Sequence, residues 1–337
     1  MPYQVRTETR ATTSGLDGTV YILEDAGGAN RAEIWPALGL NCYRWRSRNN
    51  DQPIELLYAD PHLFENGKPT RSGIPILFPF PNRIREARFT WEGKEYVLPL
   101  NDSSGPNAIH GFACQRPWRV VNQAASQNHA SLTAVFQGSI DARDARAYWP
   151  ADYRLQITYL LANRRLRIEA QVDNPDKVPL PFGLGFHPYF HVPPETAGTC
   201  TVDVKARSFW ELQKCLPTGR LLPVDAARDL NTPRRVRELN LDDVLTDLPD
   251  TAEPGAEKLC LRGIVNYGAG SKELHLLCSP SFRELVLFTP AHREAICIEP
   301  YTCTTDAIHL QAQGIDAGQL VLPPGARWSA VVEMVLN

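Results

Sequence analysis

The chain has 337 residues, of which 43% are hydrophobic, and its 35 basic and 38 acidic residues leave a formal net charge of -3. A chain of this length can bury a large core, and its scattered arginines, without a sustained basic run, predict no nucleic-acid partner. The polar beginning, and the lack of the roughly 18 consecutive apolar residues that a membrane span needs, predict a cytoplasmic protein that has no membrane partner.

The first clear element in chain order is a β-hairpin over residues 88–98, RFTWEGKEYVL. Apolar and polar residues alternate on both sides of a turn at 92–94, which is typical of two strands with one buried face. A longer hairpin is predicted over 153–174, YRLQITYLLANRRLRIEAQVDN, with its turn near Asn163. Apolar residues at every second position on both sides of that turn favour strands over helices.

Further short strands are predicted towards the C-terminus, within 273–279, 284–290, 295–300, 319–325 and 328–336. Helices are scarce, and the best candidate is TPRRVREL, residues 232–239, with Thr232 as the N-cap and Pro233 as the first helical residue. No repeat or linker divides the chain. The pattern predicts an all-β protein, a large antiparallel β-sandwich with few short helices, in one domain over 1–337.

Eight widely separated cysteines form no Cys-x-x-Cys pair, so we expect buried, reduced thiols rather than a zinc or redox site. Four other segments combine polar groups with glycine or proline: 73–85 with Asn82 and Arg83, 105–112 with His110, 183–190 with His187, and 297–306 with Glu299. Each segment alone has an ordinary reading as a surface turn, a packed core histidine or a buried ion pair.

Taken together, the segments closely resemble the aldose 1-epimerase, or galactose mutarotase, family. Its histidine in N-x-x-H-G corresponds to His110 in NAIHG, and its histidine in G-x-x-x-H-P-Y-F corresponds to His187 in GLGFHPYF. Its glutamate in I-E-P-x-T corresponds to Glu299 in IEPYT, and its arginine in N-R-I corresponds to Arg83. The order and spacing agree over roughly residues 70–305, and the resemblance implies the galactose mutarotase-like supersandwich.

The resemblance implies interconversion of the α and β anomers of a free hexose through ring opening and reclosure. That chemistry needs an acid and a base beside one sugar, and Glu299 suits the base while His187 suits the acid. Aromatic and proline neighbours would fix the His187 ring, and Gly183 and Gly185 would let backbone and substrate come close. His110 would stabilise developing charge at the ring oxygen or a neighbouring hydroxyl.

Arg83 and Asn82 are expected to hold sugar hydroxyls. The family also places an aspartate on these hydroxyls, which the resemblance assigns to Asp242 in LNLDDVLTDL, although the adjacent Asp243 leaves the register open. No metal and no cofactor are expected, because the reaction requires only proton movement. The partner is a small monosaccharide, and the oligomeric state stays open between a monomer and a weak dimer.

Two other functions are compatible with the sequence. A hexose 6-phosphate epimerase would need arginines to hold the phosphate, and Arg71, Arg83, Arg85 and Arg88 are available, with Arg83 and Arg85 expected on the same side of a strand. A non-catalytic sugar-binding protein on the same fold would need no acid/base pair. His191, where many family members have asparagine, and the ILFPFPNRI variant of the family's arginine motif leave the preferred sugar open.

Overall fold

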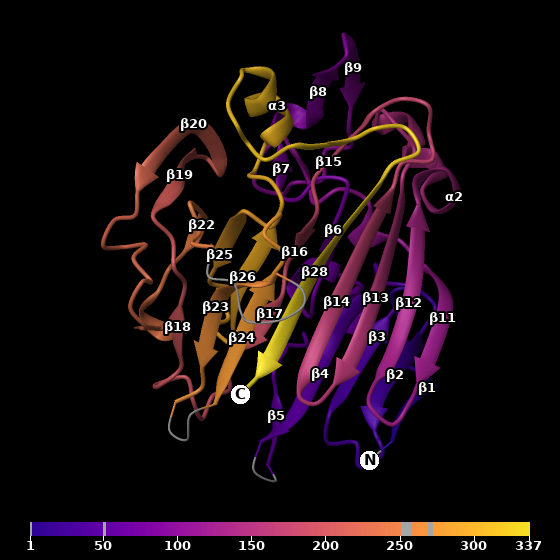
Figure 1. Ribbon diagram of the computed structural model, residues 1–337, viewed down its shortest axis with the longest axis vertical. Coiled ribbons are helices and arrows are strands. Elements are labelled where there is room, and N and C mark those ends of the chain that lie inside the picture. The colour runs from indigo at the N-terminus through magenta and orange to yellow at the C-terminus, as the bar shows by residue number, and fades with distance from the viewer. Residues whose placement is uncertain (1, 50–51, 251–257, 269–271) are drawn as a thin grey trace.

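The computed structural model describes residues 2–49, 52–250, 258–268 and 272–337. Strands dominate these residues and form three large sheets with antiparallel pairing (Figure 1). The predicted all-β class, an antiparallel β-sandwich with few short helices, is therefore confirmed. No helix within the described ranges has the length and apolar character needed to cross a membrane.

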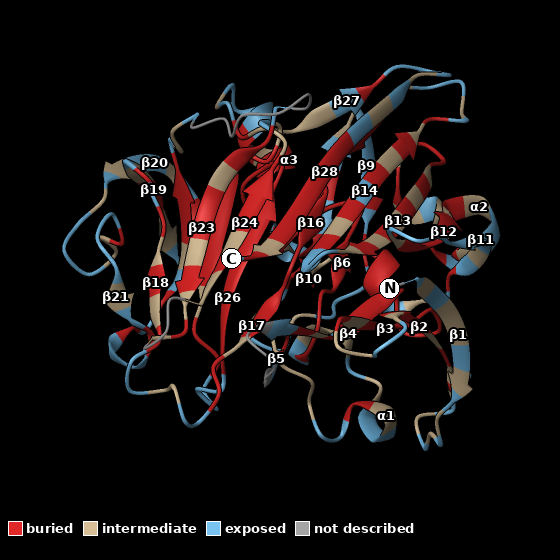
Figure 2. Cartoon of the chain, turned by 60° about the horizontal axis from the view of Figure 1, so that its bottom comes forward, coloured by how far each residue is buried: buried red, intermediate tan, exposed pale blue. Residues whose placement is uncertain are grey.

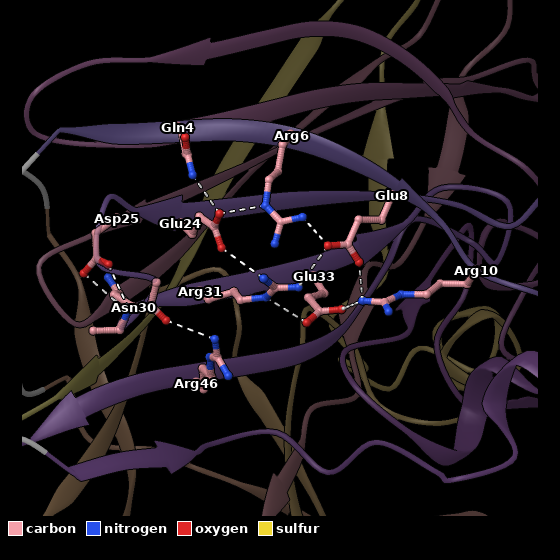
Figure 3. Close-up of polar contacts among 12 residues, drawn as sticks. Gln4, Arg6, Glu8, Arg10, Glu24, Asp25, Asn30, Arg31, Glu33 and Arg46 are labelled. Atoms are coloured by element: carbon pink, nitrogen blue, oxygen red, sulfur yellow. Dashed lines mark hydrogen bonds and ion pairs between the residues drawn. The ribbon is translucent and has the colours of Figure 1, made fainter.

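The N-terminal sheet has five strands in sequence order: β1 (Tyr3–Thr9), β2 (Thr19–Asp25), β3 (Arg31–Trp35), β4 (Asn41–Asn49) and β5 (Gln52–Glu55). One of its faces carries charges that pair across strands (Figure 3). Glu24 accepts hydrogen bonds from Arg6 at 2.7 Å and from Arg31 at 3.0 Å, although its side chain is nearly buried. These pairs allow a carboxylate to be covered by neighbouring guanidinium groups.

A nine-stranded sheet contains the predicted long hairpin. Its order is β11 (Arg119–Ala125), β12 (Ala130–Gln137), β13 (Arg154–Ala162), β14 (Arg165–Asp173), β28 (Arg327–Leu336), β24 (Glu273–Cys278), β23 (Cys260–Asn266), β18 (Thr201–Asp203) and β21 (Arg234–Arg235). Strands β13 and β14 alternate buried and more exposed residues along their length, and Leu155 pairs with Val172. This alternation buries one face of the sheet, as period two predicts.

An eight-stranded sheet carries the polar segments. It runs β20 (Leu216–Pro223), β19 (Ser208–Gln213), β22 (Asp242–Thr246), β25 (Glu284–Phe288), β26 (Ala295–Tyr301), β16 (Gly185–Phe186) and β6 (Ile76–Leu77), and β17 (Tyr189–His191) also pairs with β26. Three two-stranded sheets complete the strands: β7 (Arg83–Ile84) with β10 (Ala108–Ile109), β8 (Arg88–Trp91) with β9 (Lys94–Val97), and β15 (Leu180–Phe182) with β27 (Leu320–Leu322).

The α-helices are α1 (Leu63–Asn66), α2 (Gly138–Asp141) and α3 (Ala307–Ala312), and the described ranges also include 3-10 turns at Pro69–Arg71, Arg85–Ala87, Ala113–Gln115, Arg143–Tyr148 and Val236–Glu238. The hairpin predicted at 88–98 is β8 and β9, with its turn at 92–93. All eight cysteines are free and only Cys215 is not buried, as the sequence predicts.

The nine-stranded sheet forms one layer of the sandwich, and the other two large sheets pack against it (Figure 1). Tyr159 on β13 donates a hydrogen bond of 3.2 Å to the carbonyl of Leu40 beside the N-terminal sheet. Gly263 on β23 lies directly against Ile298 on β26 of the eight-stranded sheet. The facing residues are buried along both layers (Figure 2), and one apolar cluster joins residues from Leu23 to Leu336.

The helix predicted at 232–239 is wrong. Arg234 and Arg235 form the short edge strand β21 against β18, and only Val236–Glu238 turn as a 3-10 helix. The backbone N–H of Val236 donates to the carbonyl of Cys200, and the Val236 side chain is buried. Tertiary pairing with a sheet edge thus overrides the local signals of an N-cap followed by proline.

Candidate active site

All six predicted site residues, which lie far apart in the sequence, line one cavity of about 350 Å³. Its walls include Asn82, Arg83, His110, His187, Asp242 and Glu299, together with Thr70, Asn101, Asp102, Ser103, Ser104, Ile109, Tyr189, Val286, Phe288 and Tyr301. Antiparallel pairing places β22, β25 and β26 side by side, which brings the Asp242, Val286 and Glu299 positions to the same cavity. A larger cavity elsewhere contains none of these six residues.

Glu299 lies on the central strand β26, and its side chain is buried. Period two puts Cys297 on the same face, and its thiol lies within 4.8 Å of donor atoms of both Glu299 and His187. The hydroxyl of Tyr301 donates a 2.5 Å hydrogen bond to Glu299 Oε2. Burial raises the pKa of Glu299 well above its ordinary value, and the hydrogen bond from Tyr301 opposes that rise.

His187 lies between β16 and β17, where aromatic rings fix its orientation. Its ring stacks on Tyr189 with centroids 4.6 Å apart, and Phe288 approaches it edge-on at 6.2 Å. The His187 side chain is only 6% exposed, and burial lowers its pKa well below the ordinary value. The expectation that aromatic neighbours fix this ring is confirmed, although Phe288, distant in sequence, was not predicted.

The carboxyl and the imidazole are in direct contact. His187 Nε2 lies 3.4 Å from Glu299 Oε1, in a pocket where both side chains are buried. Burial raises the pKa of Glu299 and lowers that of His187, so it favours the neutral form of each group: a carboxyl that keeps its proton and an imidazole without an extra one. Such a pair can give one proton and take another at adjacent points.

His110 reaches the cavity from a tight turn. Its backbone N–H donates to the carbonyl of Asn82, and the β7–β10 pairing holds the two segments together. Both His110 and Gly111 have φ of 65°, and a Cβ on Gly111 would lie 2.2 Å from the Phe78 carbonyl oxygen, so glycine is required there. Burial, together with the nearby Arg83, lowers the pKa of His110 to about 3, which leaves a neutral imidazole in the cavity wall.

Arg83 is held by a residue that the sequence reasoning missed. Its Nε donates to Asp102 Oδ2 at 2.8 Å, and its Nη1 donates to Asn82 Oδ1 at 3.0 Å. Asp102 also accepts hydrogen bonds from Ser104 and Asn107, and the Arg83 guanidinium is among the groups that lower its pKa. The turn-forming sequence NDSSGPN, residues 101–107, was the available signal for this loop.

The contacts of Asp242 and Asp243 show which of the two aspartates faces the cavity. Asp242 lines the cavity, whereas Asp243 forms an ion pair with Arg228, with Nε and Oδ1 2.6 Å apart. Adjacent residues on a strand point to opposite faces, so only one of the two can face the cavity.

The other arginines do not line the cavity. The expectation that Arg85 shares a side with Arg83 is wrong, because the chain enters a 3-10 turn at Arg85 and its guanidinium pairs with the buried Asp306 at 3.1 Å. Arg88 is exposed and lies 4.0 Å from Glu95. Arg71 is exposed, and its neighbour Thr70 lines the cavity.

The two glycines before His187 make room for protein rather than for substrate. A Cβ on Gly183 would lie 2.4 Å from Cys303 Sγ, and one on Gly185 would lie 2.6 Å from the Tyr301 ring. Neither glycine lines the cavity. The expected close approach is therefore to neighbouring side chains, and in the case of Gly185 it seats the tyrosine that contacts Glu299.

His187, Cys297 and Glu299 also form a group with metal-ligand chemistry, since their donor atoms all lie within 4.8 Å of one another. A cation bound there would occupy both Glu299 and His187. His191 stands four residues after His187, but its Nδ1 faces the Glu55 carbonyl at 3.3 Å instead.

Comparison with known proteins identifies the relationship. The sequence model of the aldose 1-epimerase family matches residues 41–335. The chain belongs to the aldose 1-epimerase family. Among curated members it is 30% identical over 193 residues to the uncharacterized protein YihR of Escherichia coli, and the match covers 56% of each chain. It is 27% identical over 157 residues to galactose mutarotase of Sus scrofa, with 45% of this chain and 43% of that protein covered.

The matched regions therefore span about half the length of these curated aldose 1-epimerase relatives. A galactose mutarotase-like protein from Clostridium acetobutylicum superposes over 100% of this chain and 99% of its own, with a TM-score of 0.87 at 21% identity. The galactose 1-epimerase of Lactobacillus acidophilus gives a TM-score of 0.73 at 16% identity, covering 99% and 98% of the two chains. At these identities the structural likeness establishes the shared fold.

Proposed function

We propose that this family member interconverts the α and β anomers of a free hexose, with Glu299 as the base and His187 as the acid. The 3.4 Å contact between Glu299 and His187 in the wall of a polar cavity carries the proposal. Ring opening removes a proton from the anomeric hydroxyl and delivers one to the ring oxygen. Both oxygens are bonded to the same carbon, so the base and the acid must be neighbours.

The protonation states give the order of events. In the free protein the shared proton lies on Glu299, and it passes to His187 across their contact when the sugar is bound. The Glu299 carboxylate then takes the proton of the anomeric hydroxyl, whose electrons form the carbonyl. The bond between the anomeric carbon and the ring oxygen breaks, and the ring oxygen takes its electron pair and the proton from His187.

The open chain leaves Glu299 protonated and His187 neutral, which is the state that burial favours. Rotation about the bond between the first two sugar carbons turns the other carbonyl face towards the hydroxyl. Reclosure reverses the proton movements and gives the opposite anomer. No net charge enters or leaves the site, which suits a pair with little access to solvent.

The remaining residues position the sugar. Arg83, fixed by Asp102, and the amide of Asn82 offer donors to sugar hydroxyls, whereas Asp242 offers a carboxylate acceptor. The neutral His110, whose ring centroid is 5.8 Å from that of His187, is placed to donate to the ring oxygen or a neighbouring hydroxyl.

The charges of the cavity favour an unphosphorylated sugar. Arg83 is the one arginine among the described lining residues, and it is already paired with Asp102. Asp102 itself and Asp242 supply acidic groups in the same wall. A phosphate dianion would meet these carboxyl groups without a free guanidinium cluster, whereas neutral hydroxyls can use both donors and acceptors.

Polarimetry of freshly dissolved α-D-glucose, α-D-galactose and their 6-phosphates with the purified protein tests the proposal. Faster approach to the equilibrium rotation of the free sugars supports it. A preference for the 6-phosphates would instead assign the hexose 6-phosphate reaction. Binding of the sugars without any acceleration would show a non-catalytic carbohydrate-binding protein.

A further inference from the structure

A second cavity, larger than that of the candidate active site, lies apart from it and has no role in the proposed reaction. It has a volume of about 690 Å³ and is lined by Tyr3, Asp25, Gly27, Ala29, Asn30, Ser47, Arg48, Gln127, Asn128, Asn163 and Arg164. It shares no residue with the candidate active site. This volume is within the roughly 300–1,000 Å³ typical of small-molecule sites.

The cavity is built where three turns meet at the N-terminal sheet. The turn between β2 and β3 supplies Gly27, Ala29 and Asn30, and the tips of the β11–β12 and β13–β14 hairpins supply 127–128 and 163–164. These hairpin tips lie at the end of the molecule where the N-terminus is found (Figure 1). The backbone N–H of Asn163 donates to the Tyr3 hydroxyl at 2.7 Å, which ties one tip to β1.

Asn30 and Ser47, on the floor of the cavity, have hydrogen-bonding atoms without a partner among the described residues. Asn30 is 4% exposed and Ser47 is 0% exposed, yet Asn30 Nδ2 and Ser47 Oγ form no hydrogen bond within the described ranges. The other end of the Asn30 amide is fixed, because Oδ1 accepts from Trp45 Nε1 at 3.3 Å. Buried polar groups are usually paired, so two unpaired groups on one cavity floor indicate a polar ligand.

Hydrogen bonds fix the turn that carries Asn30. Asp25 accepts the backbone N–H groups of Ala29 at 2.8 Å and of Asn30 at 3.2 Å, and Arg46 Nη2 donates to the Gly28 carbonyl at 3.1 Å (Figure 3). The turn that presents the Asn30 amide is thus held from both sides. The floor is preorganised rather than formed by flexible surface side chains.

The lining chemistry selects the ligand class. Amides from Gln127, Asn128 and Asn163 and the phenol of Tyr3 surround the floor, so donors and acceptors are mixed. Ala29 offers little apolar surface, which disfavours a lipid-like ligand. Asp25 lies in the same lining as Arg48 and Arg164, so the cavity combines charges of both signs. We propose that this cavity is a second, non-catalytic site for a neutral oligosaccharide, whose hydroxyl groups both donate and accept hydrogen bonds.

The probes are sucrose and trehalose, which lack the free anomeric hydroxyl that mutarotation requires. Isothermal titration calorimetry gives the affinity, and the ¹⁵N-labelled side-chain amides report the location. We expect both disaccharides to bind and to shift the Asn30 and Asn163 amide signals. Ser47→Ala and Asn163→Ala should each weaken binding on the order of 3- to 10-fold, as expected for one net hydrogen bond.

Asn122→Ala, at an exposed position on β11 outside the cavity, is the matched control and should bind like the wild type. Glu299→Gln should also retain disaccharide binding, and Ser47→Ala should retain wild-type mutarotation. The two variants therefore test disaccharide binding and the proposed reaction separately. A thermal unfolding curve checks that each variant is folded.

Three results would overturn the proposal: no disaccharide binding at millimolar concentrations, binding that is equal in Ser47→Ala, Asn163→Ala and wild type, or loss of binding in Glu299→Gln. Inorganic phosphate that binds in place of the disaccharides and is lost in Arg164→Gln would define an anion site, and would overturn the assignment to a neutral oligosaccharide.

Discussion

Replacement of Tyr301 by phenylalanine tests the proton-transfer pair most directly. The change removes one hydroxyl, which donates the 2.5 Å hydrogen bond to Glu299, and leaves the buried ring in place. A hydrogen bond to a carboxylate stabilises its ionised form and lowers its pKa. Its loss should therefore raise the pKa of Glu299 further above the already raised value.

The magnitude follows from the charged acceptor. Hydrogen bonds to charged groups contribute about 1.5–3 kcal/mol, and one pKa unit corresponds to about 1.36 kcal/mol, so the shift should be about 1–2 units. Ionisation of Glu299 before ring opening becomes harder by the same amount. We therefore expect kcat to fall about 10- to 100-fold, while KM changes little.

The assay is the pH dependence of kcat/KM, which reports the ionisations of the free enzyme. The active pair carries one proton. If that proton lies on Glu299, loss of the hydroxyl moves the alkaline limb upwards by about 1–2 units and leaves the acidic limb in place. Movement of the acidic limb alone would show that His187 holds the proton.

A profile in which neither limb moves would refute the claim that Tyr301 tunes Glu299. Tyr159→Phe is the matched control, because its buried hydroxyl donates to the Leu40 carbonyl at 3.2 Å outside the site. That variant should lose some stability and keep the wild-type profile. A matching shift in both variants would mean that the effect comes from general destabilisation.

Glu299→Gln and His187→Asn should each lower kcat by at least ~10²-fold in folded protein, and near-normal mutarotation by either would remove that residue from the mechanism. Arg83→Gln should lower kcat/KM for every sugar by about 10²-fold, because it misplaces the ring, whereas the exposed Arg88→Gln should be mild. A ratio of kcat/KM for glucose 6-phosphate over glucose above one, collapsing in Arg88→Gln, would contradict the free-sugar assignment. EDTA should leave mutarotation unchanged, while added Zn²⁺ should inhibit it and Cys297→Ser should relieve that inhibition. Activity lost with EDTA and restored by metal would show a required ion instead.

The sequence by itself determined the strands that carry the core and the candidate site residues. In β13 and β14, the alternation of apolar and polar residues is enough to predict which side chains are buried. Successive side chains of a strand point to opposite faces, so this pattern depends only on the local sequence. The resemblance to the family motifs likewise selects His110, His187 and Glu299 as candidates, because each motif lies within a short stretch of sequence. These are short-range signals, readable without knowledge of the fold.

Contacts between distant segments were decided only by the tertiary structure. Pairing with β18 converts a predicted helix at 232–239 into a strand and a 3-10 turn, and a turn at Arg85 directs that side chain to Asp306 rather than to the cavity of the candidate site. The same assembly sets the 3.4 Å separation of His187 from Glu299. Separations of this kind depend on which strands become neighbours, and that choice is made by burial of the whole sheet rather than by local sequence.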